Sequence, residues 1–425
     1  MKRFALILLI IFTAFIANAG ISFDDYFLNK SMRLDYIHTG NKSMEVFSFD
    51  ELREEPYWGG SKVNLIDIFD YGKYKFEVYD AASNTLIYSH TYSTLFAEWQ
   101  TTEEAKTVTR SLSETAVFPY PLKKVNVVFY SRDKKNLFQK VWEYPIDPAS
   151  IYVSKEKRFV YPSFDVLKNG DPAVKVDLVI IPDGYTKDEM ELFKKDCEKF
   201  SKYLFNAEPF KSNKKKFNIY GVEAPSQESG PDVPGENVWK NTILNTTFYA
   251  LGTDRYLMTY DDKSVRNIAA NAPYDQIYIL VNSNKYGGGS IYNYYSVCVN
   301  SNYAEEYVFQ HEFGHGFAGL GDEYYTSEVA VENFYPVELE PWEPNLTTLV
   351  NFDAKWKSLV DKQTPVPTPA ESQYSSKIGV FEGGGYNAKG IYRPALDCTM
   401  KSIIKNKFCR VCQNSIQKSI DFYSK

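Results

Sequence analysis

The chain has 425 residues, of which 44% are hydrophobic and 24% are charged, and its formal net charge is −6. This composition excludes an intrinsically disordered protein, and an acidic balance without a basic stripe argues against a nucleic-acid partner. Because an ordinary domain has roughly 100–200 residues, we expect two domains.

The first residues have the pattern of an export signal. Lys2 and Arg3 precede an almost continuously apolar run over 5–16, and Ala17-Asn18-Ala19 matches a cleavage site. We therefore predict a signal peptide over 1–19 and a mature chain in the periplasm or outside the cell. No later run reaches the roughly 18 apolar residues of a membrane-spanning helix, so we predict no membrane span in the mature chain.

Residues 20–152 have the pattern of β-strands. Apolar and polar residues alternate over 74–78 and again over 86–92, with a turn between the two runs. Two more runs of this kind begin at Val125 and Phe138. Alternation interrupted by turn residues predicts antiparallel strands, and we expect a β-sandwich that serves as an accessory domain.

Pro145 and Pro148 interrupt this pattern, and we expect the second domain to cover residues 153–425. Its continuously apolar runs predict strands that are buried on both faces and alternate with helices. The fold predicted for the whole chain is therefore α+β, with a β-sandwich followed by an α/β domain. The elements expected in the second domain are strands over 176–181, 217–222 and 277–281, a helix over 187–205 capped by Thr186 and Glu189, an irregular segment from 326, and a final helix over 408–423.

The strongest chemical signal is His311-Glu312-Phe313-Gly314-His315, within a helix that Asn302 is expected to cap. Residues four apart in a helix lie on one face, about one turn apart, so the two imidazoles can bind one metal ion. Glu312 lies beside them, where a carboxylate can take a proton from a metal-bound water. Gly319 and Gly321 are expected to end the helix and turn the chain back.

Asp322 and Glu323 follow that turn directly, and either carboxylate can supply a third ligand. The plainer interpretation of both residues is a solvated acidic turn. Two histidines, a carboxylate and a position left for water are typical of catalytic zinc, although other divalent metals accept the same donors. We therefore predict one Zn²⁺ per chain.

The pattern H-E-F-G-H-x-F-x-G-L-x-D-E-Y over 311–324 resembles the IgA-peptidase family of bacterial zinc metallopeptidases, which are relatives of the metzincins. Most of 160–425 shares in the resemblance, and the strand-rich front half resembles the N-terminal domain that accompanies this peptidase. The shorter matching pieces are VIIPDGY at 179–185, FEGGGY at 381–386, GIYRP at 390–394, CTM at 398–400 and FCRVC at 408–412.

The resemblance implies zinc ligands at His311, His315 and Asp322, with Glu312 as general base. The glycine and the carboxylate each come one residue later than in the common metzincin pattern. Glu323 therefore stays open as an alternative third ligand, and otherwise it is expected to be a supporting or structural acid.

The resemblance also implies a metzincin-like catalytic domain in which Met400 lies in a Met-turn beneath the metal. Methionine also fills gaps in ordinary cores. Tyr386 or Tyr392 is a candidate hydrogen-bond donor to the oxyanion of the reaction, although both also suit a structural role. The glycines at 287–289 suit either a rim that lets a substrate backbone approach or a plain hairpin loop.

Three of the five cysteines, Cys398, Cys409 and Cys412, lie close together near the C-terminus. In an exported protein they favour a disulfide, but three cysteines leave one over and do not define the pairing. Cys409-x-x-Cys412 also suits a metal knuckle or a redox pair, although a structural zinc normally needs four ligands.

Together these patterns predict a secreted zinc endopeptidase that acts on proteins or peptides, with host glycoproteins among the candidate substrates. One alternative is an exported module that binds protein or glycan and carries a non-catalytic zinc site. Another is a zinc amidase that acts on cell-wall peptide.

Overall fold

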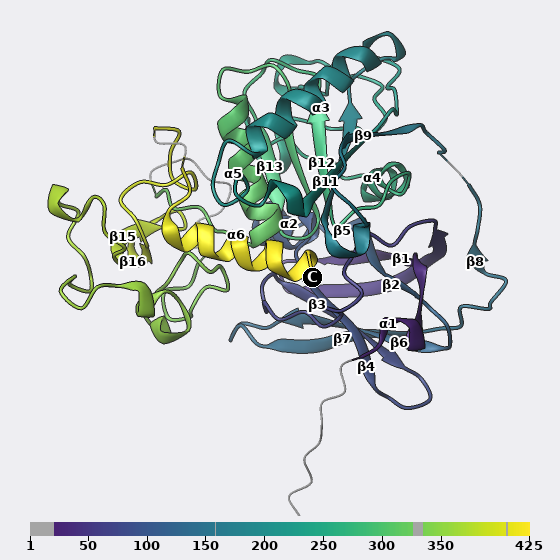
Figure 1. Cartoon of the computed structure of the whole chain (residues 1–425), viewed down its shortest axis with the longest axis horizontal. Coiled ribbons are helices and arrows are strands. Elements are labelled where there is room, and N and C mark those ends of the chain that lie inside the picture. The colour runs from purple at the N-terminus through teal and green to yellow at the C-terminus, as the bar shows by residue number, and fades with distance from the viewer. Residues whose placement is uncertain (1–20, 158, 326–334, 405–406) are drawn as a thin grey trace, which may run out of the picture.

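The structure is a computed structural model that describes residues 21–157, 159–325, 335–404 and 407–425. The predicted signal peptide over 1–19 lies outside these residues. Two four-stranded sheets form the first part of the chain, and a six-stranded sheet with helices forms the second (Figure 1). The α+β class predicted from the sequence is confirmed. No helix among the described residues is long and apolar enough to cross a membrane.

The two four-stranded sheets share one aromatic-rich core, in which rings from one sheet contact rings from the other. The Tyr36 and Phe129 rings lie 5.2 Å apart, and those of Phe76 and Phe118 lie 6.1 Å apart. Sheets packed in this way form a sandwich. The first sheet has the order β5 (Arg110–Pro121), β1 (Phe27–Asn41), β2 (Met44–Glu55), β8 (Val153–Ser154), and the second has the order β4 (Leu86–Tyr92), β3 (Tyr74–Asp80), β6 (Val125–Arg132), β7 (Phe138–Ile146).

This part of the chain also contains helices that the strand pattern did not predict: α1 (Phe23–Tyr26) and α2 (Leu95–Thr101). Thr94 caps α2 by accepting a hydrogen bond from the backbone N–H of Ala97, and Leu95 and Trp99, one turn apart, are both buried. The strand β8 pairs in parallel with β2, so the first sheet extends beyond residue 152.

The six-stranded sheet of the second part is parallel at its centre and antiparallel at both edges. The three buried strands predicted from continuous apolar runs are its strands β10, β11 and β12. Their burial on both faces is confirmed, since every residue of the three strands is buried. The sheet has the order β13 (Gly288–Ile291), β14 (Tyr295–Val299), β12 (Gln276–Val281), β10 (Val176–Asp183), β11 (Phe217–Val222), β9 (Ser163–Leu167).

Alternate residues of β10 pack into different cores. Leu178 and Ile180 belong to a core that they share with three helices on one face of the sheet. Val179 and Ile181 belong to the core on the opposite face. The helices on the first side are α3 (Met190–Leu204), α5 (Glu305–Ala318) and α6 (Arg410–Tyr423), and the helix on the second side is α4 (Asp262–Ala269).

The single helix predicted over 187–205 is a 3-10 turn (Lys187–Glu189) followed by α3. The predicted capping box is present, because Glu189 accepts a hydrogen bond from the backbone N–H of Thr186 at 2.8 Å. The described residues from 335 onward form α6, three short 3-10 helices and one hairpin, β15 (Phe381–Gly384) and β16 (Asn387–Arg393). Figure 1 shows this hairpin in a lobe beside the six-stranded sheet, with α6 leading back toward the sandwich.

Candidate active site

The helix α5 presents the two histidines, and the rest of its surface is packed. The ring centroids of Phe309 and Tyr278 lie 4.3 Å apart, and those of Phe313 and Phe210 lie 5.5 Å apart. A Cβ on Gly316 would lie 2.4 Å from Ser296 Oγ, so glycine is required where the helix approaches β14. This close packing fixes the helix against the sheet.

The ends of α5 largely follow the prediction. Gly319 ends the helix in the left-handed conformation, with φ 60° and ψ 29°. At the other end the helix begins at Glu305, so Asn302 lies outside the cap position. Its Oδ1 accepts from the backbone N–H of Ala304 at 3.0 Å, and Glu305 Oε2 accepts from the backbone N–H of Asn302 at 3.4 Å. The predicted side-chain contacts of a cap are therefore present at Asn302, but the regular helix begins only at Glu305.

Three donor atoms converge beside α5. His311 Nε2 and His315 Nε2 are 3.1 Å apart, and Asp322 Oδ1 lies 3.1 Å from the first and 3.3 Å from the second. The turn at Gly319 returns the chain so that Asp322 reaches the histidines. All three side chains are largely buried, with 16% of the His315 side chain and 6% of the Asp322 side chain exposed.

Backbone carbonyls orient both imidazoles. His311 Nδ1 lies 3.0 Å from Thr399 O, and His315 Nδ1 lies 2.5 Å from Leu320 O. Because a carbonyl only accepts, each Nδ1 carries the hydrogen and donates it. A neutral imidazole then presents its Nε2 lone pair to the point where the three atoms converge, as in metal-binding histidines generally.

These residues fit a zinc ion. Tetrahedral coordination with metal–donor distances of about 2.0–2.1 Å places the donors about 3.3–3.4 Å apart, close to the separations of the three atoms here. Asp322 Oδ1 is buried and accepts no hydrogen bond from the described residues. A buried carboxylate oxygen facing two imidazole lone pairs is stabilised by a cation placed between them.

Asp322 is also fixed from its other side. The hydroxyl of Tyr386 donates to Asp322 Oδ2, and the backbone N–H of Gly385 donates to Asp322 O at 2.8 Å. Gly385 and Tyr386 form the turn of the β15–β16 hairpin, both with positive φ. The hairpin thus orients the carboxylate, a contact that no local pattern in the sequence predicts.

The charges of the site perturb one another. Burial opposes ionisation of Asp322, yet the two imidazoles hold its pKa well below the ordinary value. Burial also favours neutral His315, but Asp322 and Glu312 raise the pKa of His315 to about 9. The pKa of Glu312 is raised by burial. A raised pKa suits a carboxylate that accepts a proton and later returns it.

Met400 packs against α5 at Gly314. It is fully buried, and a Cβ on Gly314, between the two histidines, would lie 2.9 Å from Met400 Sδ. The carbonyl of Met400 accepts from the backbone N–H of Glu323 at 2.8 Å. Met400 therefore contacts both α5 and the segment that carries Asp322 and Glu323.

Glu312 faces a cavity of about 700 Å³, large enough for a segment of peptide. One of its carboxylate oxygens lies within 4.8 Å of the histidine donor atoms. A Cβ on Gly288 would lie 3.2 Å from Glu312 Oε1, so the glycine leaves room beside this carboxylate. Of the predicted glycine run, Gly288 and Gly289 belong to the edge strand β13 and line the cavity.

The sandwich supplies part of the cavity wall through α2. Glu98 lines the cavity, and burial raises its pKa to about 7. The hydroxyl of Tyr256, from the second part of the chain, donates to Glu98 Oε2. No sequence pattern points to either residue, because the pair exists only where the two parts of the chain meet.

Two other candidates lie away from the donor atoms. Tyr392 pairs with Thr347 and packs in a small satellite core. Glu323 points away from the histidines: its Oε1 accepts from Asn345 Nδ2 at 3.0 Å and lies 3.3 Å from Cys412 Sγ. Burial raises the pKa of Glu323 well above its ordinary value. Of the two adjacent acids, Asp322 is the one that lies beside the histidines.

Two family models match the chain. The family model described as IgA Peptidase M64 matches residues 164–374 and 370–420, and the model described as Peptidase M64 N-terminus matches residues 22–143. No individually curated protein matches the chain. The first family model covers more than half of the sequence and includes all three donor residues. The chain therefore belongs to the IgA peptidase M64 family, and it is a peptidase.

Proposed function

We propose that the chain is an exported, zinc-dependent endopeptidase in which His311, His315 and Asp322 hold the metal. The observation that carries the proposal is the convergence of their donor atoms at 3.1–3.3 Å beside a cavity that Glu312 faces. The apolar N-terminal run followed by Ala17-Asn18-Ala19 supports export to the periplasm or the outside of the cell.

Zinc bound there would act as a Lewis acid that polarises the scissile carbonyl and makes water acidic near neutral pH. Glu312 accepts the proton of the attacking water, and the same carboxyl then protonates the leaving amine. Its burial keeps the proton affinity of the carboxylate high enough for both roles.

The remaining residues position these groups. Thr399 and Leu320 hold the imidazoles through their carbonyls, and Tyr386 holds Asp322. The tyrosine hydroxyl is engaged by the carboxylate in this structure, so a positioning role explains its contacts without a direct role toward the oxyanion. Substrate lies in the cavity between α2 of the sandwich and the edge strand β13.

The test is hydrolysis of a substrate panel by the purified chain before and after metal removal. The panel contains an unfolded protein such as reduced casein, folded glycoproteins including immunoglobulins, and cell-wall peptides. We expect cleavage within a protein chain, loss of that cleavage after treatment with a chelator, and recovery when zinc is returned. Cleavage that persists after metal removal would refute the zinc dependence, and activity confined to cell-wall peptide would favour an amidase.

A further inference from the structure

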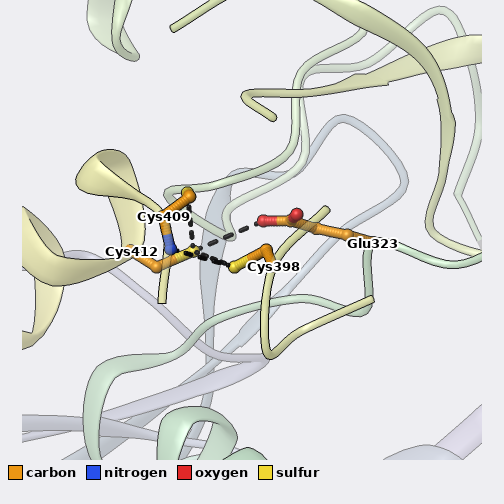
Figure 2. A group of neighbouring side chains, drawn as sticks. All are labelled: Glu323, Cys398, Cys409 and Cys412. Atoms are coloured by element: carbon orange, nitrogen blue, oxygen red, sulfur yellow. Dashed lines mark hydrogen bonds between the residues drawn. The ribbon is translucent and has the colours of Figure 1, made fainter. Parts of the chain in front are cut away.

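Three cysteines and one carboxylate converge on the far side of the segment that carries Asp322. Figure 2 shows the side chains of Cys398, Cys409, Cys412 and Glu323 directed toward one another. Cys412 Sγ lies 3.8 Å from Cys398 Sγ, 3.5 Å from Cys409 Sγ and 3.3 Å from Glu323 Oε1. All four candidate ligand atoms lie within 4.8 Å of one another.

These distances match metal coordination better than a disulfide. A tetrahedral zinc with Zn–S bonds of about 2.3 Å places its sulfurs about 3.8 Å apart, and a carboxylate ligand lies about 3.6 Å from each sulfur. A disulfide requires an S–S distance of about 2.05 Å. The Cys409-x-x-Cys412 pair alone supplies two ligands, which is too few for a structural zinc. Cys398 and Glu323, from other segments, bring the number to four.

Burial gives an independent reason for a cation. Cys398, Cys412 and Glu323 have no exposed surface, and Glu323 Oε2 has no hydrogen-bond partner among the described residues. Asn345 fixes only the other oxygen, at 3.0 Å. Burial raises the pKa of Glu323 and the charge of Arg393 acts against this rise, but Arg393 Nη1 donates to the carbonyls of Glu382 and Gly383. A buried carboxylate oxygen without a partner is costly unless a cation or a proton satisfies it.

We propose that Cys398, Cys409, Cys412 and Glu323 bind a second, structural metal ion, with zinc the best match to the three thiolates and one carboxylate. Four protein ligands leave no position for water, which is the mark of a structural rather than a catalytic site. This ion is additional to the single zinc predicted from the sequence. The proposal does not depend on peptidase activity.

The four ligands come from segments that build the active site. Glu323 follows Asp322 directly, and Cys398 precedes Thr399, whose carbonyl accepts from His311 Nδ1. Cys409 is the N-cap residue of α6, and Cys412 lies in its first turn. A metal here would link three parts of the chain: the segment with Asp322, the segment with Met400, and α6. It would thereby fix the positions of the donor atoms of the catalytic site.

The first test uses the unaltered chain. We expect two zinc equivalents per chain, of which an organomercurial that titrates thiolates releases one. X-ray absorption at the zinc edge is expected to show sulfur ligands at about 2.3 Å as well as nitrogen and oxygen. Five thiols, the full cysteine content, are expected after denaturation without reductant in the presence of a chelator. Three thiols would mean a disulfide, and a spectrum without sulfur ligands would also overturn the proposal.

Variants give the second test. Cys409→Ser and Glu323→Gln are each expected to lose the zinc that the organomercurial releases, whereas Cys197→Ala, a buried cysteine outside the cluster, is expected to keep two equivalents. Two equivalents retained in Cys409→Ser would refute the site. If the histidine site instead binds nothing, the unaltered chain holds one zinc, and the organomercurial releases it. The two proposals can therefore fail separately.

Discussion

Replacing Glu312 with glutamine is expected to abolish peptide hydrolysis while the zinc content of the chain stays the same. Glutamine has the shape of glutamate but cannot accept the proton of the attacking water. General acid–base groups of this kind contribute about 10²–10⁴-fold to the rate, so we expect a loss of at least about 100-fold in kcat. Zinc is retained because its donor atoms, on His311, His315 and Asp322, are unchanged.

The matched control is Glu306→Gln, which makes the same change in the first turn of the same helix. Glu306 contacts Asn206 and lies outside the cavity lining, so we expect near-normal hydrolysis. Hydrolysis measured on casein, together with zinc content by elemental analysis, separates the two variants. A Glu312→Gln chain that retained most of its activity would remove Glu312 from the mechanism.

Replacing Asp322 with asparagine is expected to weaken zinc binding at the histidine site and to abolish hydrolysis with it. Loss of a residue that only supports a ligand costs about 10–100-fold in metal affinity, so loss of the ligand itself is expected to exceed 100-fold. The amide also removes the negative charge that lies 3.1 Å from His311 Nε2 and 3.3 Å from His315 Nε2. Competition with a fluorescent zinc chelator measures the affinity.

Glu323→Gln is the variant to compare with Asp322→Asn, because the sequence alone did not decide which of the two acids is the third ligand. The histidine site is expected to keep far more of its zinc affinity in Glu323→Gln than in Asp322→Asn, since Glu323 points toward Asn345 and the cysteines. The opposite order of affinities would assign the third ligand to Glu323.

The sequence predicted those elements in which one residue pattern determines the outcome. Largely apolar runs predicted the strands β10, β11 and β12, and Gly319 marked the end of α5 because a left-handed residue was needed there. The sequence pattern did not predict the helix α2. Its seven residues make only about two turns, too few for helical periodicity to be recognised within a strand-rich domain. Asn302 makes the predicted capping contacts, but the helix itself begins later than predicted, at Glu305.

The parts of the site that could not be predicted depend on contacts between distant segments. The backbone carbonyl oxygens of Thr399 and Leu320 orient the histidines. Every residue has a backbone carbonyl, so the sequence does not show which ones make these contacts. Tyr386 reaches Asp322 only because a hairpin turn packs against the segment that carries Asp322. The separation of roles between Asp322 and Glu323 follows from neighbours far away in the sequence.

The most direct measurement is anomalous X-ray scattering at the zinc absorption edge, from crystals of the chain supplied with zinc. The account predicts a peak between His311 Nε2, His315 Nε2 and Asp322 Oδ1, at about 2.0–2.2 Å from each atom. Crystals without a peak at that position would contradict a zinc peptidase mechanism for this chain, whether or not a second peak lies at the cysteine cluster.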